Sequence, residues 1–136
     1  MSKPILCLDF DGVIHSYTSG WKGARVIPDD PVEGVISYML TMLAEGFDVV
    51  VHSSRGQSFG GIWAMRRWLR KHAGNAWYEC PMGPGLEDVR FARRKPSALI
   101  TIDDRALTFN GDWSHPDYRA VTIRTFKPWN KRTVSP

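Results

Sequence analysis

Three short polar segments of this sequence hold the residue types that phosphoryl transfer requires. Asp9-Phe10-Asp11, Ser53-Ser54-Arg55 and Asp103-Asp104-Arg105 each directly follow an apolar run. A carboxylate can act as a nucleophile on phosphorus, and grouped carboxylates suit Mg²⁺, which prefers oxygen ligands. A hydroxyl and a nearby basic group would bind the phosphoryl oxygens as their charge develops. The pattern therefore predicts a magnesium-dependent site for phosphoryl transfer through an aspartyl intermediate.

The apolar runs that lead into these segments are predicted to be strands, at residues 5–10, 48–53 and 98–102. Continuous apolar runs of this length are typical of parallel strands buried on both faces. Such a strand should not end on two carboxylates unless a cation or basic groups compensate their charge. Ligands bind at the carboxyl ends of strands in open α/β sheets, so the polar segments should meet at one edge. Gly12, directly after Asp11, allows the chain to turn sharply there.

Two helices are predicted. The first lies between the first and second strands, and the second follows the second strand. In the first, Asp30 is the expected N-cap, Pro31 takes the first helical position and Glu33 completes a capping-box spacing. Apolar residues then recur at helical spacing until Gly46 ends the helix. The second helix is expected at residues 62–72. Strand, helix and strand in this order predict a right-handed parallel crossover.

The segment 75–95 allows two interpretations. One places a strand at residues 76–80 and a helix at 86–94, which would leave Lys95 at the wrong end of the sheet. The other places a strand at 88–92, so that Lys95 follows it at the catalytic edge. We favour the second, although only seven residues then separate Lys95 from Asp103. If it were wrong, Arg93 or Arg94 would supply the positive charge.

The expected fold is an α/β, three-layer α/β/α sandwich with a mostly parallel, Rossmann-like sheet of about five strands. The last strand is expected at residues 118–126, where apolar and polar residues alternate. With 136 residues, of which 43% are hydrophobic, the chain has the size of one domain. We assign that domain to residues 1–126 and a basic tail to residues 127–136.

Composition also bears on location and partners. No apolar stretch approaches the roughly 18 residues of a membrane span, no signal peptide is visible, and Cys7 and Cys80 lack a metal or redox spacing. These features favour a reducing cytoplasm. The formal net charge is +4, and basic residues far outnumber acidic ones between residues 55 and 95. That balance suits an anionic partner, whereas a merely solvated helix face explains any single basic residue equally well.

The ordered set of motifs resembles the haloacid dehalogenase (HAD) superfamily of hydrolases. Asp9-Phe10-Asp11-Gly12-Val13 is similar to its first motif, Ser53 to its second, Lys95 to its third, and Asp103-Asp104 to its acidic fourth. The set spans residues 5 to 105, most of the chain. Each motif alone is weakly specific, but their order is distinctive. The segments Ser53-Ser54-Arg55 and Ile102-Asp103-Asp104-Arg105 look closest to compact polynucleotide 3′-phosphatase domains and small 5′-nucleotidases, including phage-encoded ones.

The resemblance implies a role for each matching residue. Asp9 would be the nucleophile that becomes the phosphoaspartate, and Asp11 the general acid and base. Ser53 would bind the phosphoryl group, and Lys95 would stabilise its charge. Asp9, the Asp11 carbonyl, Asp103 and Asp104 would hold Mg²⁺. Ser54 and Arg55, which follow Ser53 directly, would contact the substrate.

The short segment 15–30 is expected to form a flap rather than a cap domain. An open site of this kind suits an exposed phosphate, such as that of a nucleotide or a nucleic-acid end. Trp21 in the flap would stack on a base, or Trp21 and Tyr17 merely pin the loop to the body of the domain. A small-metabolite phosphatase and a catalytically weak nucleic-acid-binding module with the same scaffold are the alternatives.

Overall fold

A computed structural model describes residues 2–132 of the chain. The chain forms two compact units, Met1–Asp103 and Asp104–Pro136, which are described separately below. Within residues 2–132, no helix is long and apolar enough to cross a membrane.

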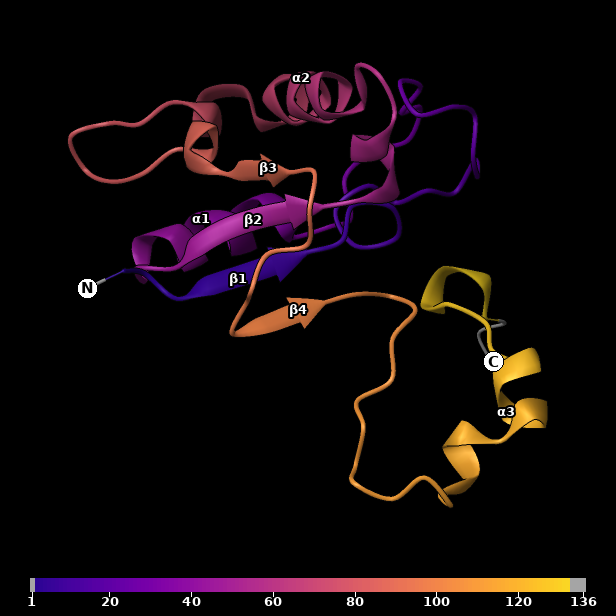
Figure 1. Cartoon of the computed structure of the whole chain (residues 1–136). Helices are drawn as coiled ribbons and strands as arrows, with labels where there is room; N and C mark the ends of the chain where they lie inside the picture. The colour runs from indigo at the N-terminus through magenta and orange to yellow at the C-terminus, as the bar shows by residue number, and fades with distance from the viewer. Residues whose placement is uncertain (1, 133–136) are drawn as a thin grey trace. The chain divides into compact units, whose positions relative to one another are not determined.

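The first unit is built on a parallel sheet of four strands (Figure 1). They are β1 (Ile5–Leu8), β2 (Asp48–His52), β3 (Arg90–Ala92) and β4 (Ile100–Ile102), in the order β3-β2-β1-β4. Every neighbouring pair is parallel. The predicted α/β class with a parallel, Rossmann-like sheet is thereby confirmed, and β1 lies at its centre between β2 and β4.

The position of β3 decides between the two interpretations of segment 75–95. A strand is present at Arg90–Ala92, as the favoured interpretation requires, and it pairs with β2. The alternative strand at 76–80 is absent from the described residues, where a 3₁₀ turn covers Gly74–Trp77 instead. Because β3 and β4 occupy opposite edges of a parallel sheet, the short link between them must cross the sheet.

Helices α1 (Val35–Ala44) and α2 (Gly61–Ala73) share one core with the central strands. Leu6 pairs with Val49 and Leu8 with Val51, so these four side chains share one face of the sheet. The face packs against apolar residues of both helices, among them Met39, Met65, Trp68 and Leu69. Phe10, two residues after the end of β1, is fully buried in the same core.

The start of α1 differs from the prediction. The helix begins at Val35 after Gly34, whose φ of 87° is left-handed, and not at an Asp30 N-cap. The physical reason lies in the backbone: Ser16 donates to the Asp30 carbonyl at 2.9 Å, and Val32 donates to the Ile14 carbonyl at 2.8 Å. These bonds hold the chain extended where the capping-box pattern predicted the first helical turn. The predicted stop at Gly46 is confirmed, with φ of 96°.

The second unit contains the short helix α3 (Ala120–Arg124) between two 3₁₀ turns, Pro116–Tyr118 and Trp129–Lys131. The strand predicted at 118–126 is therefore wrong, and the described residues form four strands rather than about five. Alternation in this short segment is outweighed by local bonding: the Ile123 amide donates to the Arg119 carbonyl at 3.0 Å. The last four residues of the predicted basic tail, 133–136, lie outside the described part of the chain.

Candidate active site

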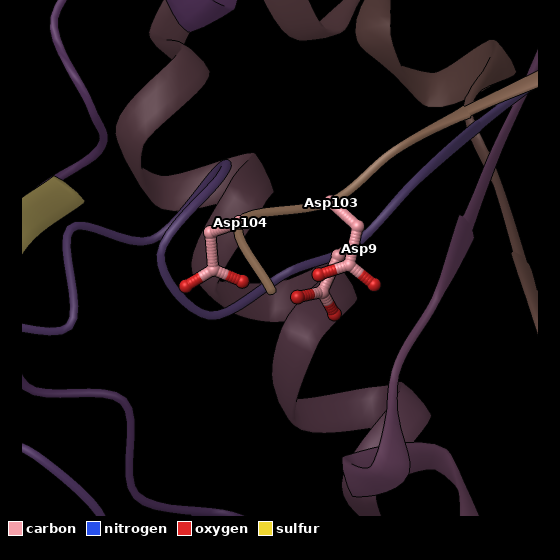
Figure 2. A group of neighbouring side chains, drawn as sticks. All are labelled: Asp9, Asp103 and Asp104. Carbon is pink, nitrogen blue, oxygen red and sulfur yellow. The ribbon is translucent and has the colours of Figure 1, made fainter. Parts of the chain in front are cut away.

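Asp9 and Asp103 lie side by side at the carboxyl ends of two neighbouring strands. Leu8 of β1 is in register with Ile102 of β4, and the Asp9 amide donates to the Ile102 carbonyl at 3.0 Å. Asp103 directly follows Ile102, and Asp104 follows Asp103. One carboxylate oxygen from each of the three acids lies within 4.8 Å of the other two (Figure 2).

These three carboxylates fit a hard divalent cation. All the donors are oxygen atoms, the type that Mg²⁺ prefers, and the exposed Asp103 leaves room for the water ligands that Mg²⁺ usually keeps. Carboxylates at this separation repel one another, which a divalent cation would offset. The residues present therefore fit the metal that the sequence predicts.

A second acidic group does not belong to this site. Glu79, Glu87 and Asp88 also bring carboxylate oxygens within 4.8 Å of one another. A hydrogen bond and charge repulsion from Asp88 raise the pKa of Glu79. These acids precede β3 in the chain, so they lie toward the amino ends of the strands, whereas Asp9 and Asp103 lie at the carboxyl ends.

Asp11 bonds to a different set of side chains. The turn after it is tight, with Gly12 in a left-handed conformation at φ of 83°, as the sequence predicts. Its Oδ2 and Oδ1 accept from Arg55 Nε at 2.9 and 3.1 Å, and His15 Nδ1 lies 2.8 Å from Oδ1. Asp11 is not a member of the acidic group around Asp9.

These contacts set the ionisation of Asp11. Burial raises the pKa of its carboxyl, but hydrogen bonds from His15 and Arg55 and the charge of Arg55 outweigh burial and lower the pKa below its usual value. In this arrangement Asp11 is ionised at neutral pH. It would have to exchange its partners before donating a proton.

Arg55 is a fully buried arginine that fastens the flap. Its side chain has 0% exposure, and its Nη1 donates to three flap carbonyls, of Gly23, Ala24 and Val26, at 2.8, 3.1 and 3.2 Å. Trp21, 53% exposed, lies with its ring centre 4.8 Å from the Arg55 Cζ. The contact with substrate phosphate predicted for Arg55 stays a prediction: Nε binds Asp11 and Nη1 binds the flap, whereas the buried Nη2 has no hydrogen-bond partner among the described residues.

His15 and Trp68 bond to Asp29, near the end of the flap. His15 is also fully buried, and its Nε2 accepts from the Asp29 amide at 3.1 Å. The Trp68 indole on α2 donates to the Asp29 carbonyl at 3.1 Å. His15 is not among the site residues predicted from the sequence. The spacing of four residues between Asp11 and His15 is the one hint the sequence holds.

Ser53 shapes the loop that presents Arg55. It is buried, and its hydroxyl accepts from the Arg55 amide at 3.2 Å, at the start of the 3₁₀ turn Ser54–Gln57. Ser54 is exposed. Gly61 lies in close contact with this loop. A Cβ at Gly61 would lie 1.7 Å from the Arg55 carbonyl oxygen, so the loop requires glycine there. The predicted substrate contacts of the two serines are not tested by these positions.

Lys95 is exposed and follows the end of β3 by three residues. The Gln57 side chain donates to the Arg93 carbonyl and ties this segment to the loop after β2. Lys95 also lies within electrostatic reach of Cys7 in β1. Burial raises the pKa of the Cys7 thiol, Lys95 opposes that rise, and the charges of Asp9 and Asp103 add to it. The charges of Lys95, Asp9 and Asp103 thus all act on the Cys7 thiol.

Comparisons with known proteins add no relative. No protein-family model matches the chain, and searches of curated proteins and of solved structures find no significant match. Any argument about function therefore depends on the residues themselves.

Proposed function

We propose that the chain is a Mg²⁺-dependent phosphomonoester hydrolase of the HAD type, acting through a phosphoaspartate at Asp9. The observation that carries the proposal is the meeting of Asp9 and Asp103 at the ends of the paired strands β1 and β4, with their carboxylate oxygens within 4.8 Å. The order of the four sequence motifs supports the same assignment. Asp9, Asp103 and Asp104 would hold the metal, which would supply positive charge against the substrate phosphate.

In the first step, an Asp9 carboxylate oxygen attacks phosphorus. The bond from phosphorus to the ester oxygen breaks, and the alcohol leaves with a proton. In the second step, water attacks the phosphoaspartate, the bond between phosphorus and Asp9 breaks, and inorganic phosphate leaves while the carboxylate is restored. The charge of Lys95 would stabilise the phosphoryl oxygens during both steps.

Asp11 is the proposed proton donor in the first step and base in the second. Its present bonds to Arg55 and His15 favour the ionised form. Protonation therefore requires the carboxylate to turn away from Arg55, whose Nη1 binds the flap. Motion of the flap and protonation of Asp11 would thus be linked through Arg55.

A nucleotide or nucleic-acid end is the proposed substrate class. The flap is short, and its Trp21 is half exposed beside Arg55, where a base can stack on the ring. No bulky cap domain separates the first motif from α1. A small sugar phosphate has no base to stack on Trp21 and would gain less from this open site.

A panel of phosphomonoesters tests the proposal. The wild-type chain is assayed with nucleotides, 3′-phosphorylated oligonucleotides, sugar phosphates and p-nitrophenyl phosphate, each with Mg²⁺ and with EDTA. We expect release of phosphate only with Mg²⁺, and fastest from the nucleotides or oligonucleotides. Faster turnover of sugar phosphates would favour a metabolite phosphatase, and no turnover of any ester would contradict the proposed activity.

A further inference from the structure

We infer that the outward face of α2 binds single-stranded nucleic acid. The inward face of this helix enters the core through Met65, Trp68 and Leu69. The outward face carries four exposed cations, which are Arg66, Arg67, Arg70 and Lys71. None of these residues has a part in the proposed phosphatase site.

Aromatic rings lie between these cations. The Arg67 Cζ is 5.1 Å from the centre of the Trp63 ring, and the Arg66 Cζ is 4.8 Å from that of Trp77. A guanidinium stacked on a ring keeps its N–H edge available for a phosphate, as at Arg67, whereas the Arg66 guanidinium also donates to the Val89 and Glu87 carbonyls at 3.5 Å. Trp63 is 61% exposed, so its ring also offers surface on which a base can stack.

The face is hollowed along the helix. A hollow of about 640 Å³ is lined by Trp63, Arg66, Arg67, Arg70, Trp77 and Glu87. A second includes Arg25 and Lys71, and a third extends to Tyr78. Arg67 lines all three hollows, so they adjoin one another. Residues four apart on a helix rise by about 6 Å, which sets Trp63, Arg67 and Lys71 in a row along this track.

The charge of the face is largely uncompensated. In residues 2–132, the ion pairs within 4.0 Å involve other basic residues than these four. Among the described residues that line the three hollows, the one acid is Glu87, which lines only the first. A polyanion is therefore the complementary partner. An acidic peptide would pair only with the cations. A nucleic-acid strand with unstacked bases would pair with the cations and also stack on Trp63 and Tyr78, which favours the nucleic acid.

Binding is measured by fluorescence anisotropy with a labelled single-stranded oligonucleotide in EDTA, so that no turnover is required. If three or four phosphates are neutralised, the logarithm of the affinity should fall with the logarithm of salt concentration with a slope of about −2 to −3. We expect Arg67→Glu/Arg70→Glu to weaken binding by at least about tenfold. Trp63→Ala should weaken it by about five- to a hundredfold through lost stacking.

The matched control is Arg119→Glu/Arg124→Glu, which changes the net charge equally but alters the second unit. It should retain most of the binding, and circular dichroism checks that every variant is folded. An equal loss in the control pair, no effect of Trp63→Ala, equal competition by polyglutamate, or no binding at low salt would each overturn the inference. Because p-nitrophenyl phosphate hydrolysis is measured separately, loss of this surface and failure of the proposed function give different results.

Discussion

The Arg55 guanidinium joins the Asp11 carboxylate to the flap carbonyls. Its Nε lies 2.9 and 3.1 Å from the two oxygens of Asp11, while its Nη1 donates to the carbonyls of Gly23, Ala24 and Val26. The arginine is fully buried, and the side chain of Asp11 is only 16% exposed. One side chain therefore couples the turn after β1 to the flap.

Removal of Arg55 should strongly destabilise the fold. Arg55→Met leaves Asp11 as a buried charge with His15 alone, and we expect a loss of about 3–5 kcal/mol in the free energy of unfolding, the usual cost of breaking a buried pair. Urea denaturation provides the measurement. Arg90→Ala is the control, because it breaks the exposed Arg90–Asp48 pair and should cost about 0–1 kcal/mol. Similar losses in the two variants would refute the importance of the buried pair.

Asp11 should make the stability sensitive to acid. Its pKa is lower in the folded chain than the value near 4 expected when unfolded. The ionised form therefore stabilises the fold above about pH 4, and this contribution is lost as the pH falls below that value. We expect the free energy of unfolding of the wild type to fall more steeply between about pH 5 and 3 than that of Asp11→Asn. Equal slopes would contradict this assignment.

The matching variant for the acid series is Asp48→Asn. Its hydrogen bond with Arg90, together with the charge of Arg90, also lowers the pKa of Asp48. Arg90 is largely exposed, so solvent screens the pair. The slope of Asp48→Asn should therefore stay closer to that of the wild type than the slope of Asp11→Asn.

Gly61→Ala should disrupt the loop that presents Arg55. The added Cβ would lie 1.7 Å from the Arg55 carbonyl oxygen, a backbone atom that cannot move without the loop. We expect a loss of about 1–3 kcal/mol or more in the free energy of unfolding. Gly83→Ala is the control, because its Cβ would meet nothing within 4 Å. A neutral Gly61→Ala would show that the loop adopts a different course.

Magnesium should stabilise the fold through Asp103. A ligand that binds only the folded chain adds about 2.7 kcal/mol at a hundred times its Kd, so Tm should rise with Mg²⁺ in the wild type. Asp103→Asn should abolish the rise, while its Tm without metal stays equal or increases, because repulsion with Asp9 is relieved. Glu79→Gln, in the second acidic group, should leave the rise unchanged. A rise lost in Glu79→Gln but kept in Asp103→Asn would place the ion elsewhere.

The sheet and the acids at its edge were predictable because their signals are local. Apolar runs that end on acids identify β1 and β4, and parallel pairing then brings Asp9 and Asp103 together. The start of α1 was not predictable from the sequence, because backbone hydrogen bonds with residues 14 and 16 hold segment 30–32 extended. A capping box cannot reveal a competing partner that lies far away in the sequence.

The network around Arg55 was hidden for a related reason. Nothing in Ser53-Ser54-Arg55 indicates that the arginine is buried, since arginine is seldom fully buried without a partner. Its partners, Asp11 and three flap carbonyls, come from segments about 30 to 44 residues away. Backbone carbonyls leave no trace in residue types, so the sequence could not reveal that Arg55 anchors the flap, and the substrate contact predicted for it stays a prediction.

The most direct test of the central claim compares p-nitrophenyl phosphate hydrolysis by the wild type and Asp9→Asn at saturating Mg²⁺, with folding checked by circular dichroism. The exchange removes the proposed nucleophile with almost no change in shape. We predict Mg²⁺-dependent hydrolysis by the wild type and a loss of about a thousandfold or more in kcat for the variant, the scale expected when a covalent nucleophile is removed. Hydrolysis by Asp9→Asn at a rate near that of the wild type would contradict the account.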